Sequence, residues 1–452
     1  MKTNPVNIIL KQRYEIKVRR QKTAMELQKQ LQDINTMDVL PALSKKLDSY
    51  FFPDEVLQVE KIEIDIGKVK DNISAEEWKH KILEKLDEQL KLVSITVTGN
   101  ELPGSEKFSG QQHLVNVLIW FFQYGYLPAG STYTSANELF QELVKIDESG
   151  KKILREFIFK NPDIKIIRRL AANTGFNSRE FYLQLILPHI TSDELDWFKQ
   201  ELDFYLLTKT HHDTLHGLHA VLQFVWEKIF QYIITLKENS LVSVGQIFTR
   251  VTNESMENAI EMHNEPEISS KLEKPRENES ESPSPEKEIF ISNTGLCLLA
   301  PYLTTFFKEI GLTTGNVFID KLKQQHAVYL LHWIATKKAS PTEDQLFFPK
   351  LLCGWPLLTP CINTIDFYEE EKNECEELLR SVIQNWPVLK KTSPDGLRES
   401  FLQRTGKLVE EEQEFVVQPE HQSIDLLLDY IPWTFRTILL PWMKKPLIVE
   451  WY

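Results

Sequence analysis

The chain has 452 residues, of which 42% are hydrophobic and 11% aromatic, so it is long enough for roughly two to four domains that each bury a core. Its net charge of −13 argues against a protein that binds nucleic acid, because such proteins need a basic face. No run of about twenty apolar residues occurs, and the N-terminus turns charged after Leu10. We therefore expect a cytoplasmic protein without membrane insertion.

Residues 1–96 are predicted to form a small module with the element order β-α-β-α. Apolar residues alternate with charged ones over positions 14–18, which predicts a strand with one buried face. The same alternation over positions 62–66 predicts a second strand that ends at Gly67. We hypothesise that the strands at the two ends of the chain lie in one composite sheet or in two similar sheets.

Helices are predicted between these strands and through the middle of the chain. Apolar residues at three- and four-residue steps predict helices over 27–47 and 78–90, the second with Ser74 as its N-cap. From 110 to 250, short helical patterns joined by glycine, proline and asparagine turns predict an α-helical array. The predicted fold class is therefore α+β and predominantly α-helical, with small mixed modules at both ends around this array.

Residues 251–288 are predicted to be an acidic disordered linker. Positions 253–288 contain eleven glutamates, four lysine or arginine residues and no aromatic residue. A segment of this composition cannot bury enough apolar surface to offset the entropy that is lost when a chain becomes ordered.

Beyond the linker, residues 289–390 carry strongly apolar helical patterns, and residues 391–452 are predicted to form a C-terminal α+β module. The elements expected in this module are a strand over 414–418, a helix over 424–430, and strands over 435–440 and 447–451. The last six residues read LIVEWY. They are too apolar to be left in water, so we expect them to be built into the fold.

The residues with reactive side chains form no recognisable catalytic or metal-binding motif. His212, His216 and His219 lie at i, i+4 and i+7, but a span of about 10 Å along a helix is too great for one metal ion, so we expect a solvated or interfacial helix face. Cys353 precedes the turn Gly354–Trp355. A reactive thiolate there would need a neighbouring base, and a buried reduced thiol is the simpler interpretation. We predict no catalytic residue, no metal and no cofactor.

Ser393 is predicted to cap a helix that begins with the residues Pro394, Asp395 and Gly396. Serine accepts a hydrogen bond from the first helical turn, proline fits the first position, and an acidic residue complements the helix dipole. A helix N-terminus with Arg398 or Arg404 close by could instead bind an anion. In the structural interpretation, these arginines pair with acidic neighbours or fasten the helix to the sheet.

The tryptophans near the C-terminus are predicted to fill the core or to anchor an interface, where tryptophan is favoured. Two of them follow prolines, in the pairs Pro432–Trp433 and Pro441–Trp442. With the residues above they complete the candidate set of structural and interface residues: Gly67, Cys353, Gly354, Trp355, Pro394, Asp395, Gly396, Arg398, Arg404, Trp433, Pro441, Trp442 and Trp451.

The C-terminal motifs, taken in order, resemble the tape measure proteins of contractile injection systems, which are phage-tail-like particles. The matching stretches cover most of 289–452 and read GLCLLAPYLTTFFKEIGL, AVYLLHWIAT, FFPKLLCGWPL, ECEELLRSVIQNWPVLKKTSPDGLRESFLQRTGKL, IDLLLDYIPW and ILLPWMKKPLIVEW. Near the N-terminus, VLQVEKIEIDIGKV and YLPAG are similar to the family as well. The combination of SPDGLRESFLQR with LPWMKKPLIVEW is the specific part of this resemblance.

The resemblance implies a non-enzymatic assembly protein that sets tube length and contacts tube, baseplate or spike proteins, with self-association also open. A helical ruler extends about 1.5 Å per residue, yet the sequence has no long uninterrupted helical tract. A ruler built from this chain would therefore use an extended arrangement of short elements, or the linker. The alternatives are an initiator, a scaffold or cargo-loading adaptor of the same particle, and an unrecognised cytosolic enzyme.

Overall fold

The computed structural model describes residues 8–9, 12–17, 31–48, 55–59, 61–68, 74–96, 105–172, 176–209, 215–236, 242–258, 288–361 and 367–451. The chain divides into two compact units, residues 1–116 and 117–452. Helix α4 (Gly110–Tyr124) crosses this division. Most described elements are helices, and the strands form small sheets, which confirms the predicted fold class.

The N-terminal unit, meaning the described residues of 1–116, is built on two packed helical segments. The first continues from π-helix η1 (Asn35–Val39) into α2 (Leu40–Asp48), and the second is α3 (Ala75–Thr96). The amide of Glu77 donates to the Ser74 hydroxyl over 3.2 Å, which confirms the predicted N-cap. The two segments bury one apolar core between them, made of Leu31, Ile34, Val39, Leu43, Trp78, Ile82, Leu86 and Leu90.

The strands of this unit lie outside the predicted positions. β1 (Glu55–Val59) pairs antiparallel with β2 (Ser105–Ser109), whereas residues 12–17 and 61–68 form no strand. An alternating pattern fixes which side chains share a face, but a strand also needs a hydrogen-bonding partner, so both strand predictions were wrong. The hypothesis of one composite sheet was wrong too, because β1 and β2 form a two-stranded sheet of their own.

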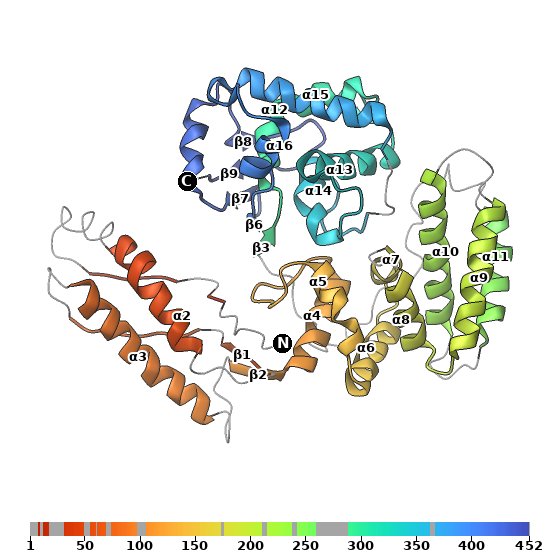
Figure 1. The fold of residues 1–452 in the computed structure, drawn as a ribbon, viewed down its shortest axis with the longest axis horizontal. Helices are drawn as coiled ribbons and strands as arrows, with labels where there is room; N and C mark the ends of the chain where they lie inside the picture. The colour runs from red at the N-terminus through yellow and green to blue at the C-terminus, as the bar shows by residue number, and fades with distance from the viewer. Residues whose placement is uncertain are drawn as a thin grey trace. The chain divides into compact units, whose positions relative to one another are not determined.

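The helical array, meaning the described residues of 117–258, begins with the second half of α4. Its helices are α5 (Ala136–Gln141), η2 (Leu143–Lys145), α6 (Glu148–Lys160), α7 (Ile164–Ala172), α8 (Phe176–Ile186), α9 (Ser192–Lys209), α10 (Leu215–Thr235) and α11 (Val244–Asn258). Helices α9, α10 and α11 lie side by side (Figure 1). Their shared core holds Phe198 against Trp226, with ring centroids 5.5 Å apart, and against Phe248 at 5.7 Å.

Two predictions for this part of the chain fall on residues that the structure does not describe. His212 lies outside the described residues, as do the side chains of His216 and His219. In the segment predicted to be a linker, α11 continues to Asn258 and the next strand begins at Glu288. Positions 259–287 lie outside the described residues.

The C-terminal body, meaning residues 288–361 and 367–451, has one five-stranded sheet in the order β3-β6-β7-β9-β8 (Figure 1). The strands are β3 (Glu288–Ile291), β6 (Gly406–Glu410), β7 (Phe415–Pro419), β8 (Thr437–Ile438) and β9 (Leu447–Val449). β7 and β9 pair in parallel, and the other ladders are antiparallel. A separate hairpin joins β4 (Thr313–Thr314) to β5 (Val317–Phe318).

Helices alternate with these strands along the chain. They are η3 (Thr294–Leu299), α12 (Ala300–Glu309), α13 (Lys321–Thr336), η4 (Glu343–Leu346), α14 (Phe347–Leu352), α15 (Glu369–Asn385), η5 (Pro387–Leu389), α16 (Pro394–Leu397), η6 (Arg398–Leu402) and η7 (Ser423–Tyr430). One apolar core includes residues from Ile291 to Trp451 and also Tyr126, which precedes them in the chain. Because β3 also pairs with β6, the segments 289–390 and 391–452 share this sheet and this core.

Four elements of the C-terminal body were expected from the sequence and occur where expected. β7 matches the strand predicted over 414–418, and η7 matches the helix over 424–430 as a 3-10 helix. β8 and β9 lie inside the two remaining predicted strands but are shorter. β3 and β6 were not predicted.

Candidate functional site

The candidate residues form several separate contacts inside the C-terminal body, apart from Gly67, which lies in the N-terminal unit. Gly67 has a φ of 68°, and its amide donates to the Asp65 carboxylate over 2.8 Å. It closes a tight turn there.

One contact joins Gly354 to Trp442. Helix α14 ends just before Gly354, whose φ of 65° lets the amide of Trp355 return to the carbonyl of Lys350 at 2.9 Å. The indole N–H of Trp442 donates to the carbonyl of Leu352 over 2.8 Å. A Cβ atom at Gly354 would lie 2.5 Å from the Trp442 carbonyl oxygen, so only glycine allows this approach. Trp442 thus covers the C-terminal end of α14.

A second contact brings Arg404 and Trp451 together on a residue that the sequence reading did not single out, Asp425. The guanidinium of Arg404 lies 3.0 Å from Asp425 Oδ1, and the indole N–H of Trp451 donates to Asp425 Oδ2 over 3.1 Å. Arg404 also donates to the carbonyls of Ser400 and Glu420. Because Asp425 is completely buried and Arg404 is 3% exposed, this network fastens the residues just after β9 and just after η6 to η7.

A third contact holds Arg398 at the start of η6. The amide of Gly396 donates to the Ser393 hydroxyl over 3.1 Å and Pro394 occupies the first turn, which confirms the predicted cap. Arg398 donates to the carbonyl of Ile334 at 2.7 Å, to Asp395 at 2.7 Å and to Glu376 at 2.6 Å. Two carboxylates therefore neutralise this buried guanidinium, as Asp425 does for Arg404, and the geometry favours a fastening role over an anion site.

The remaining aromatic candidate, Trp433, is half-buried. Its indole N–H donates to the carbonyl of Leu298 over 3.1 Å, and its ring meets Tyr302 edge-on at 5.3 Å. Pro441, eight residues after Trp433 in the chain, is exposed. Trp433, Trp442 and Trp451 thus each tie their segment to a distant acceptor with an indole N–H.

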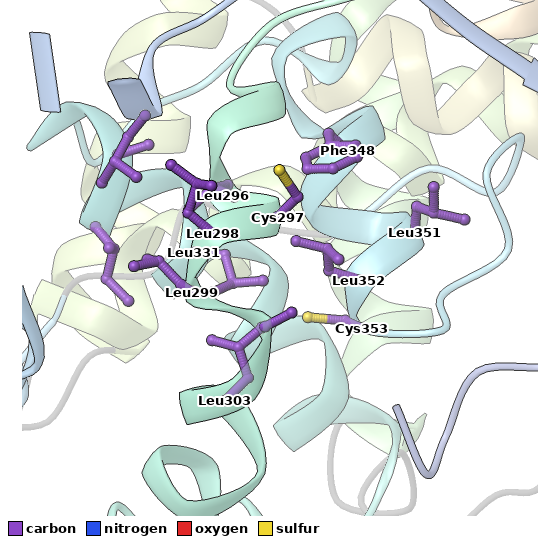
Figure 2. Packing of buried hydrophobic residues seen from close by; sticks show 14 of the residues in the cluster. Leu296, Cys297, Leu298, Leu299, Leu303, Leu331, Phe348, Leu351, Leu352 and Cys353 are labelled. Carbon is purple, nitrogen blue, oxygen red and sulfur yellow. The ribbon is translucent and has the colours of Figure 1, made fainter. Parts of the chain in front are cut away.

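Cys353 lies in an apolar environment. Figure 2 shows Cys297 and Cys353 among leucine side chains of η3 and α14. Both thiols are fully buried, and burial raises the pKa of each well above its usual range. A thiol held protonated in this way is a poor nucleophile, so the site favours core packing over a reactive cysteine.

The structure also contains a buried ionic cluster that was not predicted from the sequence. Arg169 of α7 donates from Nε to Glu343 Oε2 over 2.9 Å, and Lys350 Nζ lies 2.8 Å from Glu343 Oε1. Arg169 also donates to three carbonyls, those of Phe122, Gln123 and Leu358. The side chains of Arg169 and Lys350 are completely buried, and that of Glu343 is 5% exposed.

The charges of this cluster depend on one another. Burial raises the pKa of Glu343, while the charges and hydrogen bonds of Lys350 and Arg169 together lower it by more, so the net direction is downward. At the neighbouring Asp344, burial raises the pKa of the carboxyl group. A signal for the cluster does exist in the sequence, because Arg169 occupies a position of α7 between the buried Ile166 and Leu170. A charged residue on a buried stripe needs a partner.

The described residues contain hollows but no constellation of catalytic groups in them. A hollow of about 490 Å³ is lined by Ser243, Gly245, Gln246, Thr249 and Arg250. Another of about 330 Å³ is lined by Asp193, Glu194, Trp197, Val244 and Gly245. Neither pairs a nucleophile with a base. Across the described part of the chain, no group of three or more histidine, cysteine, aspartate or glutamate residues is placed to hold a metal ion.

Comparison with known proteins gives one match that spans nearly the whole chain. A family model described as contractile injection system tape measure protein matches residues 6–451. No curated protein and no solved structure matches. Among the described helices, none is both long enough and apolar enough to cross a membrane.

Proposed function

This chain belongs to the contractile injection system tape measure protein family, a family of structural and assembly proteins, and from this premise we propose how it works. It acts as a folded assembly component that is incorporated into the particle and contacts tube, baseplate or spike proteins. It performs this role without catalysis. The C-terminal body is the part that we assign to particle contacts.

The observation that carries the proposal is the short length of the helices. In the described part of the chain the longest are α3, with 22 residues, and α10, with 21. At about 1.5 Å per residue, one such helix spans only about 33 Å. A continuous helical ruler is therefore not available in the described residues. Contacts made by folded parts are the remaining way for them to influence tube length.

Anchoring inside the C-terminal body supports the same proposal. Its three arginine and indole contacts bind distant segments into one core, as a rigid docking body requires. The buried thiols and the lack of a nucleophile–base pair in the described hollows support a role without catalysis.

Deletion of the gene followed by electron microscopy of the particles tests the proposal. We expect tubes to be absent or uncontrolled in length, and the full-length chain supplied in trans should restore one length. Particles of normal length that lack cargo would instead support a cargo-loading adaptor. Normal, fully loaded particles would refute an assembly role.

The partner assignment needs a separate measurement. A tagged C-terminal body within the full chain should be crosslinked to tube, baseplate or spike proteins in purified particles. Crosslinks that come only from the N-terminal unit would reassign the docking part of the chain.

A further inference from the structure

The Arg169 cluster joins two parts of residues 117–452 that lie far apart in the sequence. Arg169 belongs to the helical array, whereas Glu343 and Lys350 belong to the C-terminal body. The array also contributes the carbonyl acceptors of Phe122 and Gln123. Glu343 and Lys350 pair within the body, whereas Arg169 reaches the Glu343 carboxylate only when the array and the body are in contact.

Further contacts surround this cluster. Tyr126 of the array meets Phe347 of the body edge-on, with ring centroids 5.4 Å apart. The amide of Ala136 approaches the Asp344 carboxylate at 3.4 Å. These contacts add one aromatic and one polar contribution to the junction.

Gly125 shows how closely the two parts approach. Its φ is 81°, and a Cβ atom there would lie 2.6 Å from Glu343 Oε1 and 3.0 Å from Arg169 Nε. The backbone at this turn therefore reaches the ion pair only because the residue has no side chain.

The junction has a consequence for the segment between the two parts. Asn258, which ends the array, and Glu288, which begins the body, belong to the same compact unit. We propose that the Arg169 cluster is a latch that holds the array on the body, so that the length of chain between Asn258 and Glu288 is not a spacer that sets tube length. The second half of this inference rests on the proposed function, and the latch itself does not.

Cleavage between the two parts tests the latch without any particle. A protease site is placed within positions 259–287 of the full-length chain, the purified protein is cut, and the fragments are analysed by size exclusion over a dilution series. We expect the wild-type fragments to elute together. Arg169→Met should weaken their association by roughly 100-fold, because it removes the buried hydrogen bonds that Arg169 of the array donates to Glu343 and to the Leu358 carbonyl of the body.

Two matched controls separate a latch from general destabilisation. Arg398→Met removes a comparably buried arginine that donates to Ile334, Asp395 and Glu376, all within the C-terminal body, and it should leave the association unchanged. Gly125→Ala should weaken the association, whereas Gly311→Ala should not. Gly311 has a similar φ of 71° but nothing within 4 Å of the added atom.

The outcomes of this experiment are decisive in both directions. Wild-type fragments that separate at once would overturn the latch. So would Arg169→Met and Gly125→Ala fragments that associate as tightly as those of their controls. Weakening by either variant beyond its control supports the latch, even if one of the two fails to fold.

Tube length tests the spacer half of the inference. A chain with 30 extra flexible residues within 259–287 is supplied to the deletion strain, and tubes are measured by electron microscopy. We expect an unchanged mean length. An increase that approaches about 100 Å, the reach of 30 extended residues, would overturn this half. If deletion of the gene itself leaves tubes normal, the proposed function fails, and the cleavage experiment still decides the latch.

Discussion

The N-terminal unit and the C-terminal body are stabilised in different ways. In the N-terminal unit, two helical segments share one apolar stripe, and the ion pairs lie at the surface, as Lys79–Glu76 and Lys85–Glu88 do. In the C-terminal body, buried arginines and indole N–H groups bind backbone carbonyls and carboxylates from distant segments. We therefore expect the first arrangement to tolerate the loss of single polar groups and the second to be destabilised by it.

The largest effect is expected for Asp425→Ala. This change leaves the buried guanidinium of Arg404 without its carboxylate and removes the acceptor of Trp451. We expect a loss of about 3–5 kcal/mol in the free energy of unfolding of the C-terminal body. Hydrogen exchange measured on peptides from 415–451 should show it. Glu412→Ala, at an exposed position, is the control, and equal exchange in the two variants would contradict the proposed anchoring.

A pair of tryptophan substitutions compares the two regions directly. Trp451→Phe removes an N–H donor to a buried carboxylate, so we expect a loss of about 2 kcal/mol. The indole N–H of Trp78 is buried without a partner among the described residues, so Trp78→Phe should change stability by less than about 1 kcal/mol. Denaturant unfolding, monitored by hydrogen exchange on peptides from each region, measures both changes in stability. A larger loss for Trp78→Phe would reverse the comparison.

Acid should weaken the C-terminal body through His332. This histidine is 1% exposed, and burial lowers its pKa from 6.5 to about 4. Between these two values the unfolded chain binds a proton that the folded chain does not, so the stabilisation is complete above pH 6.5 and is lost as the pH falls toward 4. Between pH 6.5 and 5 we expect this site to cost about 2 kcal/mol.

Unfolding of wild-type and His332→Gln chains at pH 7 and pH 5 checks this expectation. The variant should show a smaller difference between the two pH values than the wild type. His80→Gln, which changes an exposed histidine of the N-terminal unit, should leave the difference intact. A difference that survives in His332→Gln rules out this histidine as its source.

The smallest effect is expected for Ser74→Ala at the start of α3. The hydroxyl of Ser74 accepts from the amide of Glu77, and loss of such a cap costs about 1 kcal/mol. Faster hydrogen exchange should be confined to the first turn of α3. Ser74→Asp keeps an acceptor at the cap and should restore protection, whereas no difference between the two variants would argue against the cap.

The sequence allowed accurate prediction where the relevant contacts are local. The stripe from Trp78 to Leu90 follows from a four-residue period, and the cap at Ser74 from residues three positions apart. The predominantly helical class and β7 were accessible in the same way. Gly67 was expected to end a strand, and it closes a turn after residues 61–66, which form no strand.

The contacts that were missed depend on residues far apart in sequence. Arg404 and Trp451 were candidates, but their meeting point, Asp425, is 21 and 26 residues away from them. Arg169 and Glu343 are separated by 174 residues. No periodicity in one chain specifies such pairs, although a charged residue on an apolar helical stripe indicates that a partner exists.

The position of β9 affects the order in which the C-terminal body can form. β9 is the last of the described strands to be synthesised, yet it lies between β7 and β8 in the sheet. Until it arrives, β7 keeps an unpaired edge and β8 has no neighbour. During translation the body can therefore complete its sheet only after the stretch around Leu447 has emerged, whereas the N-terminal unit has all of its described strands and helices long before.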